Sequence, residues 1–340
     1  VKAASLIKNE INIPVIAVGR IDPENADRYI SEGKFNFLAM GRKLLADSNL
    51  PNKLMNNEAE KIKPCQYSYE CVSRIFLNGQ MVCASDINLG KTYKKSSIKN
   101  LAIIGAGPAG IELAIQAAKR KIYVSLYEKQ EFIGGNLIGA SVIYEPYRQL
   151  LNYYRQSIKN EFINLQLRNK ISFKEIQDEF SNSNIVIASG GVPQTSQSNA
   201  INIQEWLNPM ILKNKGEVDL IELSLKEEGY KSCAILGTDT IQLHLANFLN
   251  SIGIEVTLIK NSKSIGASMP VVLRWKILDD LKSHVPIISK KDLHEKEFDL
   301  IVETSFKARS NSAEIYQIGD SKNGLSYLPQ TARDAVGFFE

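Results

Sequence analysis

Histidine, tryptophan and cysteine are scarce in this sequence of 340 residues, which contains three, two and four of them. The histidines are scattered and lack the spacing of a metal site or a catalytic triad. No stretch approaches the roughly 18 to 20 apolar residues of a transmembrane helix, so we expect no membrane partner. Four cysteines do not form the framework of a small disulfide-rich secreted domain, and no charged-then-apolar leader opens the sequence. We therefore expect a cytoplasmic, reducing compartment.

Charge of one sign is also lacking. Lysine and arginine together number 41 against 37 acidic residues, which gives a net charge of +4, and no long basic block concentrates it. This balance argues against a nucleic-acid partner. The hydrophobic content of 44% and charged content of 23% are typical of globular proteins that bury a core. At roughly 100 to 200 residues per domain, the length predicts two or three domains.

Two strand, glycine-arginine, helix units follow one another near the N-terminus. The apolar run 13–18 ends in Gly19-Arg20, and the run 35–40 ends in Gly41-Arg42. Successive β/α units place both loops at the carboxyl ends of parallel strands. Backbone amides at a helix N-terminus beside an arginine can hold a phosphate. A glycine that only makes a tight turn beside a solvated arginine is an equally good interpretation.

Three of the four cysteines, Cys65, Cys71 and Cys83, fall in one short segment. Clustered cysteines in a reducing compartment are more often metal or iron-sulfur ligands than disulfides, because neighbouring thiolates can converge on one centre. The alternative is that they pack as small hydrophobic residues. Cys233 lies in an apolar, strand-like run, where we expect a core role.

The strongest motif is the stretch NLAIIGAGPAG at residues 100–110. A strand runs directly into Gly105, Gly107 and Gly110 and then into an alanine-rich helix. A second strand ends at Glu128, and 128 − 110 = 18 residues is close to the spacing of about 20 expected for the acid that binds a ribose. The glycines allow the turn, the approach of a diphosphate and the packing of helix on strand. The sequence therefore predicts a dinucleotide-binding unit.

A second strand, loop, helix and strand occupy residues 232–259. The loop GTDTIQ keeps its first glycine, Gly237, and loses the other two. Asp239 adds negative charge where a diphosphate would approach, and Gln242 crowds the contact between helix and strand. NAD(P)H binding is disfavoured here.

Residues 14–54 resemble the last two β/α units of the (β/α)8 barrel in the NADH:flavin oxidoreductase, or Old Yellow Enzyme, family. In that family the two loops bind the phosphate of FMN. The resemblance implies that Gly19, Arg20, Gly41 and Arg42 contact that phosphate. The strands that supply catalytic residues would lie upstream of Val1, so the catalytic residues are unknown and we expect the chain to be a C-terminal fragment.

The cysteine segment resembles the iron-sulfur stretch of the trimethylamine dehydrogenase and 2,4-dienoyl-CoA reductase subgroup, in which four cysteines hold a [4Fe-4S] cluster. The resemblance implies that Cys65, Cys71 and Cys83 are ligands, and it places Ser68 at the second ligand position. Serine is a harder ligand than a thiolate. A three-thiolate site with one labile iron and an intact cluster both stay open.

The downstream motifs Gly134-Gly135, IASGG with Gly190, and Gly319-Asp320 together resemble flavoproteins with two dinucleotide-binding domains. The resemblance implies that these residues line the bound nucleotide, with Asp320 near a flavin ribityl chain or an ADP. That ligand is FAD in the dienoyl-CoA reductases and ADP in the trimethylamine dehydrogenases. The choice between them stays open.

We expect an α/β fold: the C-terminal remnant of a (β/α)8 barrel followed by two Rossmann-like dinucleotide-binding domains, the second inserted in the first. The expected ranges are 1–58 for the end of the FMN-binding barrel, 59–96 for the iron-sulfur linker, 97–194 with 306–340 for the FAD- or ADP-binding domain, and 195–305 for the degenerate NAD(P)-binding-like domain.

The resemblance implies an FMN-dependent oxidoreductase that passes electrons from a small-molecule substrate, a methylated amine, through FMN and an iron-sulfur cluster to an external acceptor such as an electron-transfer protein. It also implies a homo-oligomer at full length. One alternative is an NAD(P)H-dependent 2,4-dienoyl-CoA or enoate reductase. Another is a non-catalytic module that binds ADP or FAD.

Overall fold

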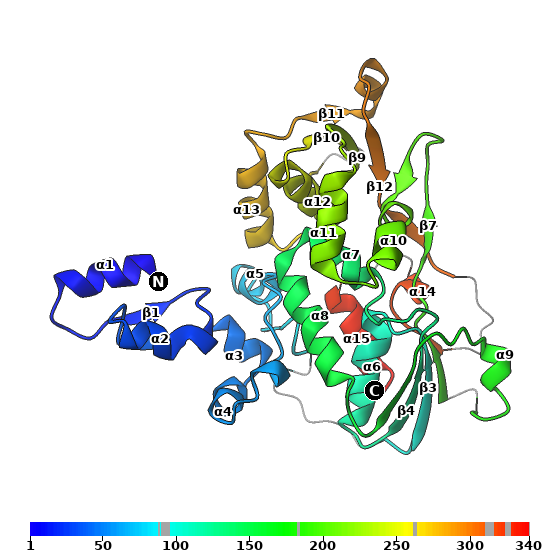
Figure 1. Cartoon of the computed structure of the whole chain (residues 1–340), viewed down its shortest axis with the longest axis horizontal. Coiled ribbons are helices and arrows are strands. Elements are labelled where there is room, and N and C mark those ends of the chain that lie inside the picture. Colours follow the sequence, from blue (N-terminus) through cyan, green and yellow to red (C-terminus); the bar gives the residue numbers. More distant parts are fainter. Residues whose placement is uncertain are drawn as a thin grey trace.

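The computed structural model describes residues 1–87, 89, 96–181, 184–260, 264–309, 316–323 and 328–339. Parts of the expected ranges 59–96 and 306–340 therefore lie outside the described residues. Two five-stranded parallel sheets with helices around them form the bulk of the molecule, and a smaller N-terminal part projects to one side (Figure 1).

The N-terminal part contains the two expected β/α units. In chain order it comprises α1 (Lys2–Glu10), β1 (Ile16–Val18), η1 (Pro23–Asn25), α2 (Ala26–Ser31), β2 (Phe37–Ala39), α3 (Arg42–Ala46) and α4 (Leu50–Met55). Strands β1 and β2 pair in parallel, with Ile16 opposite Phe37. They have no other sheet partner among the described residues. A small core of Ala17, Ile21 and Phe35 holds this part together.

The cysteine segment links this part to the first large sheet. It contains η2 (Ala59–Lys61) and α5 (Glu70–Phe76). Two tyrosines in it, Tyr67 and Tyr69, have positive φ angles of 49° and 60°. Such angles are uncommon for residues other than glycine, and they turn the backbone sharply on either side of Ser68.

The first large sheet has the strand order β14-β6-β3-β4-β5, with all pairs parallel. Its strands are β3 (Asn100–Ile104), β4 (Tyr123–Tyr127), β5 (Ile163–Gln166), β6 (Ile185–Ile187) and β14 (Tyr316–Gln317). The helices of this domain are α6 (Pro108–Ala118), α7 (Asn136–Ile143), α8 (Glu145–Ser157), α9 (Phe173–Ile176), α14 (Asp320–Asn323) and α15 (Leu328–Gly337). Every residue of α6 from Ala109 to Ala118 is buried. This helix is therefore central to the domain, with α15 and α8 packed beside it.

The second sheet repeats the architecture with the order β11-β10-β9-β12-β8, again all parallel. Its strands are β8 (Ile201–Asn202), β9 (Ser232–Leu236), β10 (Glu255–Lys260), β11 (Ile287–Ser289) and β12 (Leu300–Glu303). Its helices are α10 (Ile203–Lys213), α11 (Val218–Glu227), α12 (Thr240–Ser251), α13 (Val271–Leu281) and η4 (Lys290–Glu295). Cys233 is fully buried on β9, so its expected core role is confirmed.

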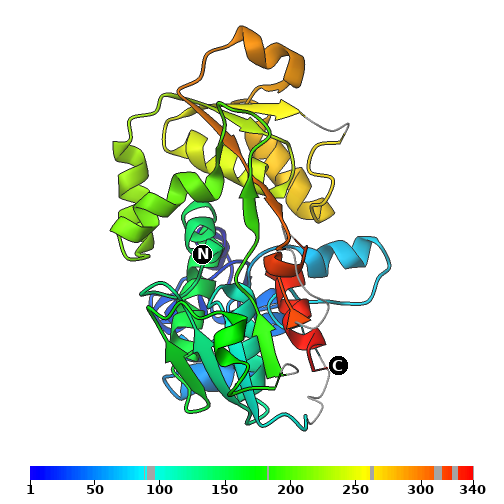
Figure 2. The ribbon, with the colours of Figure 1, turned by 90° about the vertical axis from the view of Figure 1, so that its right-hand side faces the viewer.

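The second sheet domain is inserted into the first, as expected from the sequence. Strand β14, which follows the insertion, pairs with β6, which precedes it. The chain leaves through β7 (Val192–Gln194) and returns through β13 (Ser305–Lys307). These two crossings pair antiparallel, with Gln194 opposite Ser305, and Figure 2 shows them between the lower and upper domains.

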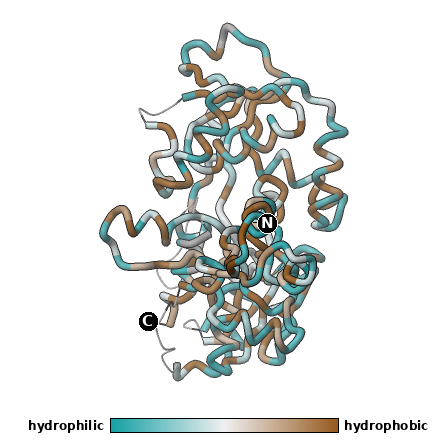
Figure 3. The backbone as a smooth tube through the Cα atoms, turned by 90° about the vertical axis from the view of Figure 1, so that its left-hand side faces the viewer, coloured by the Kyte–Doolittle hydropathy of each residue, from teal (hydrophilic) through white to brown (hydrophobic). Residues whose placement is uncertain are grey.

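No helix among the described residues is long and apolar enough to cross a membrane. Figure 3 shows apolar and polar residues interspersed along the helices. Helices α6, α8 and α12 bury their apolar residues against a sheet or a neighbouring helix, as amphipathic helices do in layered folds.

Candidate functional site

The glycine loop after β3 is shaped by close backbone contacts. Gly105 has φ +110°, and a Cβ there would lie 2.6 Å from the carbonyl oxygen of Ala188. A Cβ on Gly110 would lie 1.9 Å from the carbonyl oxygen of Gly105. By contrast, a Cβ on Gly107 would meet nothing within 4 Å. Gly105 and Gly110 are thus required by the fold, whereas the open side of Gly107 leaves room for a ligand to approach the backbone.

Glu128 at the end of β4 lies against this loop. Its Oε2 accepts a hydrogen bond from the backbone N–H of Ala106 at 2.9 Å, and its Oε1 accepts one from the N–H of Gln130 at 3.0 Å. Each carboxylate oxygen can accept a further bond. The residues therefore fit a nucleotide whose ribose bonds to Glu128 and whose diphosphate lies at the N-terminus of α6, which has no side-chain cap.

The second glycine pair closes on the first loop. The N–H of Gly134 donates to the carbonyl of Ala106 at 2.8 Å, and a Cβ on Gly135 would lie 3.1 Å from the Cα of Gly107. The structure therefore brings Gly134 and Gly135, some 30 residues along the chain, to the same place as the glycine loop.

Gly190 and Gly319-Asp320 lie at the same carboxyl edge of the sheet. Gly190 follows β6 and Gly319 follows β14, and these strands are neighbours. The carbonyl of Gly190 accepts from Arg309 Nε at 2.9 Å, and the N–H of Gly319 donates to Asp334 at 3.2 Å. Asp320 begins α14. All the predicted nucleotide residues thus share one edge of one sheet, where ligands bind in folds of this kind.

Arg20 and Arg42 come together with two tyrosines that the sequence reasoning missed. Arg20 lies over the ring of Tyr67, with 4.3 Å from the guanidinium carbon to the ring centroid, and Arg42 lies over Tyr69 at 4.7 Å. Arg20 Nη2 also donates to the hydroxyl of Tyr69 at 2.7 Å. Burial of the Tyr69 hydroxyl opposes ionisation, but hydrogen bonds from Arg42 and Arg20 lower its pKa overall. Arg42 Nη1 is buried and makes no hydrogen bond within the described part of the chain.

The glycines of the two β/α loops provide the turns that precede these arginines. Gly19 has φ +146° and a Cβ there would meet nothing within 4 Å, and Gly41 precedes the first residue of α3. Both arginines therefore project from the carboxyl ends of paired parallel strands, as the sequence predicted. An adjacent pair of guanidinium groups, with Arg20 exposed and Arg42 half-buried, is a suitable partner for a phosphate.

The three clustered cysteines line one small cavity of about 10 Å³ together with Ser68 and Arg42. All three are free thiols. Burial raises the pKa of Cys65 and of Cys83, and the other two thiols raise that of Cys83 further. No group of three or more histidine, cysteine or acidic side chains in the described ranges is arranged to hold a metal ion. The donor set nevertheless has the sulfur chemistry of an iron-sulfur site, with the hydroxyl of Ser68 at the predicted second ligand position.

The second nucleotide-like loop is filled by its own side chains. Asp239 caps α12 and accepts hydrogen bonds from the N–H of Thr240 at 2.9 Å and the hydroxyl of Ser268 at 2.7 Å. Gln242 returns to the loop, where its Oε1 accepts from the N–H of Asp239 at 3.1 Å and its Nε2 donates to Thr304 at 2.6 Å. The helix N-terminus is thus occupied by a carboxylate.

A larger groove of about 410 Å³ lies elsewhere, at the amino-terminal edge of the first sheet near Tyr123, Phe162 and Asn184. It lies at the amino-terminal ends of the strands, whereas the glycine loop lies at their carboxyl ends. Ligands in parallel α/β sheets bind outside the carboxyl ends of the strands, so this groove is not part of the candidate site.

Two family models match the sequence. The model described as pyridine nucleotide-disulphide oxidoreductase matches residues 99–299, and that of the NADH:flavin oxidoreductase / NADH oxidase family matches residues 2–61. The two matches are separated by residues 62–98, which include the cysteine segment.

Curated relatives include a reductase, an oxidase and a dehydrogenase. The chain is 34% identical over 199 residues to cinnamate reductase of Clostridium sporogenes, covering 56% of this chain and 30% of the relative. It is 29% identical over 293 residues to NADH oxidase of Thermoanaerobacter brockii, covering 81% and 43%. It is 28% identical over 213 residues to dimethylamine dehydrogenase of a Hyphomicrobium species, covering 57% and 29%. The matches therefore span less than half the length of each relative.

The fold matches a solved structure over nearly its whole length. A 2-naphthoyl-CoA reductase in complex with 2-naphthoyl-CoA superposes with a TM-score of 0.80 at 21% identity, covering 98% of this chain and 54% of that one. At this identity the likeness concerns the fold.

Proposed function

Because the chain belongs to the pyridine nucleotide-disulphide oxidoreductase family, we propose that it is the cofactor-holding part of a flavin-dependent oxidoreductase. The single observation that carries the proposal is the contact between Glu128 and the glycine loop, at 2.9 Å from Oε2 to the N–H of Ala106. It joins the ribose-binding acid to the loop that receives a diphosphate. The adenosine diphosphate portion of FAD, or ADP itself, is the ligand that this edge fits.

Three groups of residues would hold cofactors. Gly105, Gly107, Gly110, Gly134, Gly135, Glu128, Gly190, Gly319 and Asp320 would surround the FAD or ADP. Gly19, Arg20, Gly41 and Arg42 would bind the FMN phosphate, and Cys65, Cys71 and Cys83 would bind an iron-sulfur cluster. When bound, flavin supplies hydride and single-electron chemistry and the cluster supplies single-electron transfer. The chain itself neutralises phosphate charge with the two arginines and holds the cysteines side by side.

For the whole protein we propose oxidation of a methylated amine with delivery of electrons to an external protein acceptor. Two observations support this. The carboxylate of Asp239 occupies the position that a nicotinamide dinucleotide would need in the second domain, and dimethylamine dehydrogenase is a relative. A nucleotide diphosphate placed there would meet a like charge and a filled helix N-terminus.

The second candidate is reduction of an unsaturated acid or its CoA ester. It is favoured by the 34% identity to cinnamate reductase. The two candidates make opposite predictions for the full-length protein. Trimethylamine would bleach the flavin absorbance if the first is correct, whereas NADPH or another reductant followed by cinnamate would bleach and then restore it if the second is correct.

The binding proposal is tested on the chain itself by isothermal titration with ADP and with FAD. We expect one site per chain and a loss of roughly tenfold or more in affinity in Glu128→Ala, because the ribose loses its acceptor. The matched control is Glu131→Ala, which removes a nearby carboxylate that pairs with the exposed Arg168. If folded protein binds no adenine nucleotide, the proposal is wrong.

A further inference from the structure

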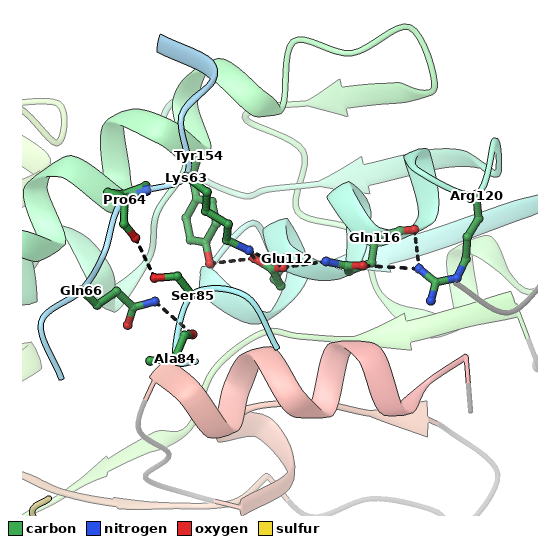
Figure 4. Close-up of polar contacts among 9 residues, drawn as sticks. All are labelled: Lys63, Pro64, Gln66, Ala84, Ser85, Glu112, Gln116, Arg120 and Tyr154. Carbon is green, nitrogen blue, oxygen red and sulfur yellow. Dashed lines mark hydrogen bonds and ion pairs between the residues drawn. The ribbon is translucent and has the colours of Figure 1, made fainter. Parts of the chain in front are cut away.

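A buried ion pair joins the cysteine segment to the nucleotide domain. Lys63 Nζ lies 2.9 Å and 3.1 Å from the two carboxylate oxygens of Glu112 (Figure 4). The residues are 8% and 1% exposed. They are 49 positions apart in the sequence, so the pair is a tertiary contact between two parts of the chain.

The carboxylate of Glu112 is the centre of a larger buried network. The hydroxyl of Tyr154 donates to its Oε2 at 3.1 Å, and Gln116 Nε2 donates to its Oε1 at 2.9 Å. Arg120 in turn donates to the carbonyl of Gln116 at 2.8 Å. Both carboxylate oxygens of Glu112 lie within hydrogen-bond distance of the one Lys63 ammonium group, which is the geometry of a charged pair.

A buried ion pair contributes little to stability by itself, because the cost of removing two charges from water offsets their attraction. Apolar residues of similar volume often serve the core as well or better. We therefore looked for a role of the Lys63–Glu112 pair in positioning the segments that carry the two residues.

The two ends lead to the two proposed cofactor sites. Glu112 is on α6, two residues after Gly110, and so is rigidly connected to the glycine loop. Lys63 is two residues before Cys65. The residues that flank Cys65 are hydrogen-bonded to the two residues that follow Cys83 (Figure 4). The carbonyl of Pro64 accepts from the hydroxyl of Ser85 at 2.6 Å, and Gln66 Nε2 donates to the carbonyl of Ala84 at 3.2 Å.

We propose that Lys63 and Glu112 are positioning residues that couple the nucleotide site at the start of α6 to the three-cysteine cavity. The inference rests on the proposed function, because it assumes that the glycine loop binds a nucleotide diphosphate. Opening of the cysteine segment would leave the Glu112 carboxylate unpaired in the core. A bound nucleotide fixes α6 and prevents the helix from moving to relieve that charge. Nucleotide binding thus holds the cysteines in their converged arrangement.

The test measures cysteine reactivity with and without ADP in the chain as it exists, free of metal. Iodoacetamide alkylation of Cys65, Cys71 and Cys83 is followed by peptide mass spectrometry. We expect saturating ADP to slow alkylation by about tenfold, within the range of typical coupling between sites. Cys233, buried in the other domain, serves as the internal reference. Coupling is reciprocal, so a protein loaded with iron and sulfide should bind ADP more tightly by a similar factor.

The decisive variant is Lys63→Met/Glu112→Leu, which removes both charges together. It avoids the unpaired charge that either single substitution would leave, so it should fold with a melting temperature near that of the wild type. We expect it to bind ADP normally but to lose the protection, with alkylation slowed less than about twofold. The matched control is Tyr154→Phe, which removes one hydrogen bond to Glu112 and keeps the ion pair. It should retain the wild-type protection.

Three outcomes would overturn the inference. If the double variant keeps full protection, the coupling travels through packing and not through the pair. If wild-type protein binds ADP by titration calorimetry without any slowing of alkylation, the two sites are independent; in both cases the proposed function stands. If no ADP binds at all, the proposed function fails and the inference fails with it.

Discussion

The three glycines of the loop after β3 do not all have the same role, and the contacts around each one distinguish a structural role from a ligand-binding role. Gly105 and Gly110 are pressed against backbone, whereas Gly107 faces open space. The sequence motif alone does not distinguish a glycine kept for folding from one kept for a ligand. The contacts do, and they make the distinction testable by adding a single methyl group.

Gly110→Ala should destabilise the chain by about 2 to 3 kcal/mol, because its methyl would overlap the carbonyl of Gly105. Gly107→Ala should leave the free energy of unfolding within about 0.5 kcal/mol of wild type. Its φ of −79° suits alanine, but the methyl would obstruct the diphosphate, so ADP affinity should fall roughly tenfold or more. Urea denaturation and ADP titration measure the two effects. Unchanged ADP affinity in Gly107→Ala would contradict the assignment.

Ser68 is the residue that decides the composition of the proposed cluster. Ser68→Cys places a fourth thiol on the cavity shared by Cys65, Cys71 and Cys83. After reconstitution with iron and sulfide, we expect the variant to retain roughly one more iron per chain than the wild type. Ser73→Cys, on α5 and not on the cavity, is the matched control. Equal iron content in Ser68→Cys and wild type would argue against a serine-limited site.

His244 makes stability depend on pH. Burial lowers its pKa to about 4, from the ordinary 6.5, and its ring lies 4.5 Å from that of Tyr144. The imidazole is therefore protonated below about pH 6.5 in the unfolded chain but only below about pH 4 in the folded chain. The free energy of unfolding consequently decreases as the pH falls from about 6.5 to 4. Since the side chain is only half-buried, we expect a loss of about 1 to 2 kcal/mol. His244→Gln should remove it in urea denaturation at several pH values, whereas substitution of the exposed His284 should not.

At the scale of elements, the sequence predicted what local pattern determines. The strand, loop, helix and strand expected over residues 232–259 are β9, α12 and β10, which run from Ser232 to Lys260, and β4 ends at Tyr127, one residue before the expected Glu128. Their signals are apolar runs bounded by glycines. The stacking of Arg20 and Arg42 on Tyr67 and Tyr69 was not predicted, because it depends on two positive φ angles that tyrosine rarely adopts. The stretch QYSYE, which places two tyrosines between Cys65 and Cys71, was the sequence feature that could have indicated this stacking.

The Lys63–Glu112 pair shows the same limit more clearly. A glutamate two residues after a GxGxxG motif looks like an ordinary helix residue, and nothing local indicates that it is buried or that a lysine 49 positions away neutralises it. Charged residues are seldom fully buried, so the prior expectation is a solvated side chain. Only the packing of α6 between the sheet and other helices reveals its role.

The cap of α12 gives a prediction at this scale. Asp239→Ala should lower stability by about 1 kcal/mol, because the amide of Thr240 and the hydroxyl of Ser268 lose their acceptor. Glu217→Ala, at the corresponding position of α11, makes no side-chain cap and should change little. Thermal unfolding compares the two.

NADPH titration of the wild type should show no binding to the inserted domain, because the side chains of Asp239 and Gln242 fill the loop that would receive the diphosphate. Binding of NADPH to this domain would contradict that interpretation.

On the scale of the whole molecule, the expected arrangement is confirmed: a barrel-like β/α part precedes two Rossmann-like sheets, and the second is inserted in the first. The order of motifs in the sequence sufficed for this prediction. In the family that the sequence resembles, the strand after the insertion returns to complete the first sheet. Trp275 on α13 could not be placed by the motif order. Its side chain is 61% exposed and contacts Phe76 of the cysteine segment edge-on.

The projecting β1–β2 pair leaves apolar side chains in solvent. Val18 is 75% and Phe37 58% exposed, and contiguous exposed apolar surface favours association. Val18→Lys/Phe37→Lys should therefore reduce self-association and the fluorescence of the dye ANS without changing ADP affinity. Light scattering and titration provide the measurements, and Leu223→Lys, at an exposed leucine of α11 in the inserted domain, is the control. Persistent self-association in the double variant would place the contact elsewhere.

The paired crossings between the sheets have an architectural consequence. Gln194 and Ser305 sit opposite each other in β7 and β13, and the side-chain amide of Asn202 donates to the carbonyls of both. The ends of the inserted domain are therefore adjacent, as the two ends of a hairpin are. A tight two-residue turn could therefore join them in a shortened chain. Helices α10 and α11 nevertheless pack on α7, and one hydrophobic core runs through both domains. Loss of the upper domain would thus uncover the apolar face of α7, so the two domains depend on each other although the chain passes between them at a single point.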